Sequence, residues 1–373
     1  MIRVANCIHG LGLGGAQQIV RFIVGRADPS QYRFFVYSSL GGVRVDDVKK
    51  AGASVEVLPR HLPKFDPLWV RALTRAFRRD RIDIVHTHLF GDSLHGFLAA
   101  RSAGGIPVVM TVHSVLKQFS FMQQLAYRWL IPRSSRVVAC SEMVRESFRA
   151  GGIRSSDEMV PIPNGIEVPE DALLESGADD PVRRKLASWS DGPILATIGR
   201  LTEAKGYSYL VRAFARLSRS IDTKPRLVLF GEGPLEDQLR SEARREGVAG
   251  QVLFAGYRSD VIELLRLVDV IVFSSLWEGL PVALLEAMAA RRCIVGTEIP
   301  GILEAVRKDR EAILVPAQDV AALHEGLRVA VNDPALRDRL GQAARERFDD
   351  RFTAERMVSQ YEAIYRQVLA GKP

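Results

Sequence analysis

Short apolar runs rich in β-branched residues alternate with longer segments of mixed polarity along most of the chain. Examples of the runs are residues 2–8, 108–112, 194–198 and 268–275. Each run has the length and composition of a strand buried on both faces of a parallel sheet, and the segments between them suit crossover helices. The pattern therefore predicts an α/β fold built from strand and helix units.

This alternation starts afresh once, near the middle of the chain. The first half opens with a strand at 2–8, a glycine-rich stretch at 10–15 and a helix from about Gln17 to Gly25, while the second opens at 193–200 with a helix from Tyr207. We expect two Rossmann-like domains, at 1–168 and 193–352. The polar, acidic, proline-containing residues 169–192 between them are expected to be a linker and hinge.

Composition is that of a large globular chain. Its 373 residues are 47% hydrophobic with a mean hydropathy of +0.01, enough for two cores. No apolar run reaches the roughly 20 residues of a membrane span, and the chain starts with a predicted strand rather than a signal peptide, so we expect a cytoplasmic protein. Cys7, Cys140 and Cys293 lie apart in apolar segments, which predicts neither disulfides nor a structural zinc site.

The net charge of +7 is concentrated in the first half. Residues 1–175 carry 22 Lys and Arg against 16 Asp and Glu, and the remainder 29 against 28. A basic half favours an anionic partner such as a phospholipid surface or a lipid diphosphate, whereas the excess is too small and the motifs too unlike RNA-binding ones to predict nucleic acid. Residues 68–79 have an apolar face and an arginine face, suiting either a membrane surface or packing on the sheet.

A second segment with surface character follows His113. Aromatic and apolar side chains gather there beside cations, which suits an interface, although packing in the core explains the same residues equally well. The side chains are Lys117, Phe119, Phe121, Met122, Tyr127, Trp129, Leu130 and Ile131.

The most informative stretch is residues 278–286, Glu-Gly-Leu-Pro-Val-Ala-Leu-Leu-Glu, which follows the apolar run 268–275. Gly279 and Pro281 indicate a turn, with Pro281 suited to a first helical position, and residues 282–290 are good helix formers. The helix would start at the carboxyl edge of the sheet, where its free N–H groups favour a diphosphate. Glu278 and Glu286 would lie about 10 Å apart. They could also be two ordinary surface carboxylates.

Two cations stand just after another predicted strand. Arg200 and Lys205 lie in Gly199-Arg200-Leu201-Thr202-Glu203-Ala204-Lys205-Gly206, where a helix begins. Both could reach one diphosphate, the arginine as a planar fork and the lysine as a point charge, or they could form a plain surface pair at the helix start.

Residues 278–286 resemble the E-x7-E signature of retaining glycosyltransferases of the GT-B fold, and are most similar to glycosyltransferase family 4. The resemblance covers the whole chain, with the more specific motifs in the second half. It implies two Rossmann-like domains facing across a deep interdomain cleft. It assigns donor-sugar hydroxyls to Glu278, the ribose diol to Glu286, donor contacts to Gly279, Leu280 and Pro281, and the leaving diphosphate to Arg200 and Lys205.

Further donor contacts are implied by the same resemblance. Gly14 and Gly15 would face the donor diphosphate, although Gln17 stands where the family usually has a glutamate. Gly231 would line the nucleotide, and Arg258 would contact the base. Ordinary turn chemistry explains both Gly231 and Arg258 as well. Because the chain contains no D-x-D pair to hold a divalent ion, we expect a mechanism without metal and without any other cofactor.

Histidines complete the set of candidates. His113 ends the apolar run 108–112, where the family places a histidine beside the donor sugar; it would bind a hydroxyl or orient the nucleophile, or be structural. His86 and His88 share a strand face that could hold metal, but no third ligand is evident. The resemblance also implies that the last helix, at about 353–373, returns to the N-terminal domain.

The function expected from the resemblance is retaining transfer of a sugar from a nucleoside diphosphate, with UDP favoured, to an acceptor hydroxyl. The basic half favours a saccharide or lipid-linked saccharide of glycan or cell-envelope biosynthesis, made at the inner face of the membrane. A nucleotide-sugar epimerase and a non-catalytic partner subunit are the alternatives. Arg291 and Cys293 depart from the family pattern, as does the glycine-free segment 307–312.

Overall fold

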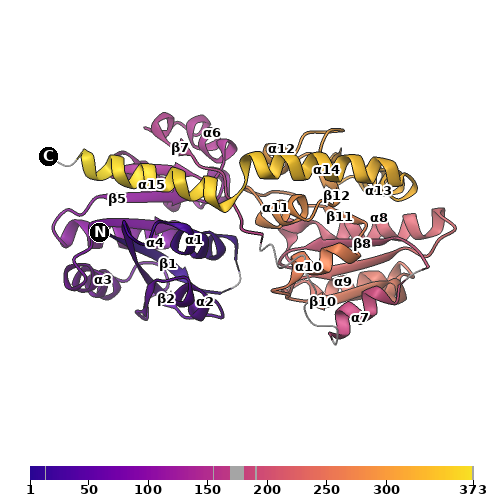
Figure 1. Cartoon of the computed structure of the whole chain (residues 1–373), viewed down its shortest axis with the longest axis horizontal. Helices are drawn as coiled ribbons and strands as arrows, with labels where there is room; N and C mark the ends of the chain where they lie inside the picture. The colour runs from indigo at the N-terminus through magenta and orange to yellow at the C-terminus, as the bar shows by residue number, and fades with distance from the viewer. Residues whose placement is uncertain (13, 154, 169–179, 190, 372–373) are drawn as a thin grey trace. The chain divides into compact units, whose positions relative to one another are not determined.

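The computed structural model describes residues 1–12, 14–153, 155–168, 180–189 and 191–371. The chain divides into two compact units. Unit 1 contains Met1–Glu167 together with Phe352–Pro373, and unit 2 contains Val168–Arg351 (Figure 1). Each unit is built on its own parallel sheet, which confirms the predicted α/β fold.

Unit 1 has a seven-stranded sheet in the order β3-β2-β1-β4-β5-β6-β7, in which every pairing is parallel. The order runs outward from β1 in both directions, as in a doubly wound sheet. Its strands are β1 Ile2–Gly10, β2 Tyr32–Leu40, β3 Ser54–Val57, β4 Ile84–His88, β5 Val108–Val112, β6 Arg136–Ala139 and β7 Val160–Pro161.

Helices cover both faces of this sheet. On one face, strand residues such as Cys7 and Met110 form a single core with Trp69, Phe97 and Phe148 of three helices. The α-helices of unit 1 are α1 Gly15–Arg26, α2 Val45–Lys50, α3 Pro67–Arg79, α4 Phe90–Ser102, α5 Phe121–Leu130, α6 Glu142–Ala150 and α15 Ala354–Ala370. Short 3-10 turns occupy Leu116–Gln118, Ile131–Arg133 and Ser156–Glu158.

The C-terminal helix α15 belongs to unit 1, although all of unit 2 precedes it in the chain. It packs against α1 and lies beside the N-terminal elements, as the yellow ribbon shows (Figure 1). The Tyr365 hydroxyl hydrogen-bonds His86 at 2.7 Å, and the Tyr361 hydroxyl lies 3.2 Å from the Thr111 hydroxyl. Both tyrosines are fully buried, so α15 completes the second face of the sheet.

Helix α3 shows how local sequence and packing agree. Asp66 caps its N-terminus by accepting from the N–H groups of Leu68 and Trp69, and Pro67 occupies the first turn. Its apolar face, including Trp69 and Phe77, is buried in the unit 1 core. That face is therefore not available to a membrane, and of the two interpretations of residues 68–79 the packed amphipathic helix is correct.

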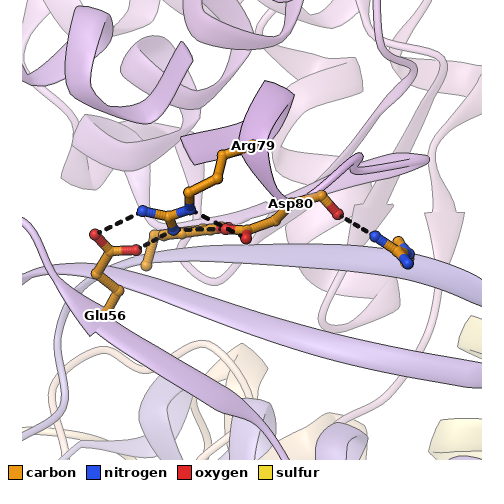
Figure 2. A network of polar contacts seen from close by, with 5 residues as sticks. Glu56, Arg79 and Asp80 are labelled. Atoms are coloured by element: carbon orange, nitrogen blue, oxygen red, sulfur yellow. Dashed lines mark hydrogen bonds and ion pairs between the residues drawn. The ribbon is translucent and has the colours of Figure 1, made fainter. Parts of the chain in front are cut away.

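A polar network fixes the end of α3 to the sheet. The Arg79 guanidinium bridges the carboxylates of Glu56 in β3 and Asp80 (Figure 2). Asp80 Oδ2, which accepts from Arg79, also accepts from the Tyr37 hydroxyl at 2.6 Å, and Arg3 donates to the Asp80 carbonyl. The Arg79 hydrogen bonds hold the pKa of Asp80 below its usual range. These contacts join α3 to three neighbouring strands.

Unit 2 has a six-stranded parallel sheet in the order β10-β9-β8-β11-β12-β13. Its strands are β8 Ile194–Ile198, β9 Arg226–Phe230, β10 Val252–Gly256, β11 Val270–Phe273, β12 Cys293–Thr297 and β13 Ile313–Val315. Its α-helices are α7 Pro181–Ala187, α8 Tyr207–Ser220, α9 Glu236–Arg245, α10 Val261–Leu264, α11 Val282–Ala289, α12 Pro300–Ala305, α13 Val320–Asn332 and α14 Pro334–Arg351. Short 3-10 turns lie at Glu203–Lys205, Ala249–Gln251 and Leu265–Leu267.

Part of the expected linker is helical. Within 169–192, residues 169–179 and 190 lie outside the described residues, but Pro181–Ala187 forms α7. Asp180 caps α7 by accepting from the Arg183 N–H at 2.7 Å and also pairs with Arg258. The stretch preceding β8 thus contributes an element of unit 2.

All three cysteines lie in the two hydrophobic cores. Cys7, Cys140 and Cys293 are buried free thiols. Within the part of the chain that the structure describes, every helix falls short of the length and apolarity needed to cross a bilayer.

Candidate functional site

The loops that follow β8, β9 and β11 converge at the carboxyl edge of the unit 2 sheet, as expected for parallel strands. Leu201 N–H donates to the Glu232 carbonyl at 2.9 Å, which joins the loops after β8 and β9. Leu276 N–H donates to the Ala204 carbonyl at 2.7 Å, which joins the loops after β8 and β11. The sequence-predicted residues on these loops are thereby brought together.

Glycine is required at two points of this junction. Gly231 has φ +144°, and a Cβ there would lie 2.0 Å from the Gly199 carbonyl oxygen. Gly206 has φ +61°, and a Cβ would lie 2.2 Å from the Ser274 carbonyl oxygen. Because no larger residue fits these approaches, the two glycines allow the loops to meet at backbone distance. Gly231 thus has a structural role at the predicted site.

An ion pair lies where the loops meet. The Lys205 ammonium pairs with Glu278 Oε1, and the Ser275 hydroxyl donates to the same oxygen at 2.9 Å. The Ser274 hydroxyl donates to the Lys205 carbonyl at 2.8 Å, which holds the backbone of this residue in place. The side chains of Lys205 and Glu278 are 16% and 15% exposed. Both charges are therefore largely withdrawn from water yet reachable at the edge.

Helix α11 starts directly beyond this pair. Pro281 is its N-cap rather than its first helical residue, because its ψ of 123° is extended, and no side chain caps the helix. The first turn therefore offers N–H groups toward an anion. Gly279, Leu280 and Pro281 form the turn, and Leu280 is buried. Glu286, in the second turn, is only 8% exposed and has a partner of its own.

The two arginines predicted for the site differ in their surroundings. Arg200 is exposed, and its guanidinium makes no hydrogen bond or ion pair with the described residues. Arg258 instead pairs with Asp180 at 2.8 Å and Asp260 at 2.6 Å. Those carboxylates raise the pKa of Arg258 and use its planar fork to hold the start of α7. The Arg200 side chain is thus unengaged among the described residues, whereas the Arg258 guanidinium is held by two carboxylates.

In unit 1, the sheet edge carries a cluster of imidazoles. His88 Nδ1 lies 3.3 Å from His113 Nε2, and His88 Nε2 lies 3.1 Å from Asn6 Oδ1. The rings of His86 and His88 are 4.1 Å apart between centroids. Burial lowers the pKa of His113 to about 4 and that of His86 to about 3, so both are neutral at pH 7. Sequence reasoning found the histidines but not the contribution of Asn6.

The glycine-rich stretch of unit 1 enters α1. Gly14 is the N-cap of that helix and Gly15 its first residue. A Cβ on Gly14 would lie 2.3 Å from Gln17 Oε1, so the Gln17 side chain folds back over the start of the helix. Gln17 thus occupies the position beside Gly14 where a family glutamate was expected.

Among the described residues, no group of three or more His, Cys, Asp or Glu is placed to hold a metal ion.

Sequence analysis missed Asp92, in the first turn of α4. It is fully buried, and neither carboxylate oxygen has a hydrogen-bond partner of good geometry among the described residues. Burial raises its pKa to about 7, offset only in part by the charge of Arg60 and the N–H groups of His9 and of Asp92 itself. Leu89, the N-cap of α4 three residues before Asp92, has φ +68°, an uncommon and strained conformation for leucine.

Comparison with known proteins gives matches over both units. Residues 13–169 match the family model of Glycosyltransferase Family 4, and residues 179–347 match that of Glycosyl transferases group 1. A putative glycosyltransferase EpsF of Bacillus subtilis (strain 168) is 30% identical over 80% of this chain and 79% of its own length. An Escherichia coli relative named UDP-Gal:alpha-D-GlcNAc-diphosphoundecaprenol alpha-1,3-galactosyltransferase is 24% identical over 81% of this chain and 79% of its own length.

Among solved structures, Anabaena Alr3699/HepE in complex with UDP-glucose superposes with a TM-score of 0.84. It is 19% identical, and the match covers 98% of this chain and 100% of that one. This likeness shows that the two α/β units have the GT-B fold.

The buried Asp92 predicts a dependence of stability on pH. Its folded pKa is raised above the ordinary aspartate value, so its contribution favours folding at low pH and is lost as pH rises from about 4 to about 7. We expect Asp92→Asn to be more stable than wild type at pH 8, by on the order of 3 kcal/mol, with little difference near pH 4.

Urea unfolding at several pH values measures this difference. Asp46→Asn, at an exposed position in α2, controls for the loss of a negative charge. A wild type at least as stable as Asp92→Asn at pH 8 would show that the carboxylate has a compensating partner.

Proposed function

Since the chain belongs to the family 4-like glycosyltransferases, we propose that it transfers a sugar from a nucleoside diphosphate to an acceptor hydroxyl. The observation that carries this proposal is the pairing of Lys205 with Glu278 beside the uncapped start of α11. Two opposite charges and a set of free N–H groups lie together there, and a nucleoside diphosphate sugar has groups that match each of them.

The cationic part of the site suits the diphosphate. Lys205 supplies a point charge, Arg200 is exposed and unengaged among the described residues, and the α11 N-terminus adds backbone N–H groups. As the glycosidic bond breaks, negative charge grows on the leaving phosphate, and donors already in place stabilise it. We propose that Arg200 and Lys205 neutralise this leaving group.

The carboxylates suit the hydroxyl groups. A carboxylate accepts hydrogen bonds from two vicinal hydroxyls, and such charge-assisted bonds are strong where water is excluded. Glu278, at the loop, would bind the donor sugar, and Glu286, one turn into α11, would bind the ribose. Gly279, Leu280 and Pro281 would form the surface between them. His113 of unit 1 would hydrogen-bond a hydroxyl of the reactants.

We further propose UDP as the nucleotide, retention of anomeric configuration, and independence of metal ions and other cofactors. The names of HepE, in complex with UDP-glucose, and of the E. coli UDP-Gal transferase support the choice of UDP. The latter name also supports a lipid-linked saccharide acceptor, consistent with the basic charge of residues 1–175. Both relatives named above are called transferases, which supports sugar transfer over an epimerase or a non-catalytic subunit.

We expect one nucleotide and its sugars, UDP among UDP, GDP and ADP, to bind and to stabilise the protein in the presence of EDTA. Lys205→Ala should weaken binding at least tenfold, because the diphosphate loses a charge-assisted contact worth about 1.5–3 kcal/mol. Titration calorimetry and thermal shift measure this. Lys224→Ala, elsewhere in unit 2, is the control, and equal binding by Lys205→Ala and wild type would refute the assignment.

The ion pair makes a second prediction. Glu278→Gln should bind UDP more tightly than wild type, roughly severalfold, because Lys205 loses its competing carboxylate, while sugar transfer falls. Glu203→Gln, at an exposed position on the loop that carries Lys205, should leave UDP affinity near the wild-type value. Weaker UDP binding by Glu278→Gln would mean that this carboxylate contacts the nucleotide directly. Calorimetric titration with UDP distinguishes these results.

We also propose peripheral contact with an anionic membrane at the cytoplasmic face, through α5. Of the segment after His113, Tyr127, Leu130 and Ile131 are buried, but four side chains of α5 are exposed. These are Phe121 at 78%, Met122 at 68%, Leu125 at 51% and Trp129 at 40%. Arg133 lies over the Trp129 ring at 5.2 Å, so a cation accompanies this apolar surface. Apolar side chains beside cations match acyl chains and anionic headgroups.

Vesicle sedimentation tests this contact. A Phe121→Ser and Trp129→Ser double variant should bind vesicles of anionic phospholipid at least fivefold more weakly than wild type, and binding should fall with salt. Leu68→Ser, which changes an exposed apolar side chain of α3, is the matched control. The proposal fails if α5 variants bind as wild type does, or if only Leu68→Ser loses binding.

A further inference from the structure

A chain of hydrogen bonds runs from the interior of unit 1 to His113. Asn6 of β1 and His88 of β4 are fully buried, whereas His113, just after β5, is half-buried. Asn6 pairs with His86 in the β1–β4 register, and His88 pairs with Thr111 in the β4–β5 register. Because side chains alternate along strands, these residues share one face of the sheet, the face covered by α15.

His88 uses both ring nitrogens within this chain. Its Nε2 lies 3.1 Å from Asn6 Oδ1, and its Nδ1 lies 3.3 Å from His113 Nε2. The rings of His88 and His113 are stacked, with centroids 5.5 Å apart and planes at 29°. Burial lowers the pKa of His88 well below its usual value, as it does for its neighbours, so each ring carries one proton.

The positions of those protons follow from the acceptor at the buried end. An amide oxygen only accepts, so His88 must hold its proton on Nε2 and donate it to Asn6 Oδ1. His88 Nδ1 is then bare, and His113 must donate to it from Nε2. The remaining nitrogen of His113, Nδ1, is left without a proton, and no described residue hydrogen-bonds it.

We infer that Asn6, acting through His88, holds His113 as the Nε2–H tautomer and so presents its Nδ1 as a hydrogen-bond acceptor for a hydroxyl group of a bound saccharide. Asn6 and His88 are positioning residues in this arrangement. The assignment of a hydroxyl to His113 rests on the proposed transferase function; the tautomer itself does not.

The residues around these rings leave the direction of the His88–His113 hydrogen bond to Asn6. The His86 ring contacts that of His88, with planes tilted by 40°, but directs its own nitrogens elsewhere, to the Tyr365 and Thr111 hydroxyls, both at 2.7 Å. No ion pair involves any of the three rings among the described residues. Leu89, next to His88, has φ +68°, a backbone conformation that the packing around the end of β4 must impose. Only Asn6 can therefore set the direction of the His88–His113 pair.

Nitrogen-15 spectra of the imidazoles in the full-length protein, without nucleotide, test the inference. In wild type at pH 7, His113 should show the Nε2–H tautomer. Asn6→Asp should keep it, because a carboxylate also only accepts. Asn6→Leu should give His113 a mixture of both tautomers. Thr111→Val removes a hydrogen-bond partner of His86 and of Tyr361 but none of His88 or His113, so it should leave the His113 tautomer unchanged.

A wild-type His113 with its proton on Nδ1 would overturn the inference, since the amide of Asn6 would then be donating to His88. A switch of tautomer in Asn6→Asp would do the same. These readouts require no turnover, so they can fail while the transferase proposal stands. In activity assays, Asn6→Leu should lower kcat on the order of tenfold with KM nearly unchanged, and Asn6→Asp should retain most activity.

Discussion

The proposed donor site depends on the ion pair between Lys205 and Glu278. Both side chains are largely removed from water at the carboxyl edge of the unit 2 sheet, and a hydrogen bond from Ser275 fixes the carboxylate. Such a pair is costly to break unless the ligand replaces both partners. A diphosphate can take over the lysine while sugar hydroxyls take over the glutamate. The proposed donor carries both groups on one molecule, so it could replace both partners of the pair.

The glycines explain how this arrangement can exist on separate loops. Gly206 and Gly231 allow backbone approaches that a Cβ would prevent, so the loops after β8, β9 and β11 join by direct hydrogen bonds. The ion pair is thereby held by the rigid end of a sheet. At the carboxyl edge of the unit 1 sheet, by contrast, the neutral side chains of Asn6, His88 and His113 are joined by hydrogen bonds without an ion pair.

Sequence patterns predicted the fold well because parallel strands buried on both faces are nearly continuous apolar runs, such as β11 and β12. They also located the candidate residues, since the loops after such strands meet at one edge. They did not predict α7, which lies in a stretch without apolar periodicity and depends on the Asp180 cap and on Arg258. Nor could sequence patterns predict which side chains of the segment after His113 are buried and which are exposed. The burial of Tyr127 and the exposure of Phe121 depend on how α5 packs. Asn6 and Asp92 were not predicted, because the role of each depends on residues distant in sequence. Asn6 contacts His88, and Asp92 interacts with Arg60.

A structure of the full-length protein in complex with a UDP-sugar, prepared without divalent metal, tests the central claim most directly. The account predicts a diphosphate in contact with Lys205, Arg200 and the N-terminus of α11, a ribose bound by Glu286, and a sugar bound by Glu278 with the Lys205–Glu278 pair opened or shared. A nucleotide bound away from the loops after β8 and β11, or one bound there while Glu286 makes no contact with it, would contradict the account.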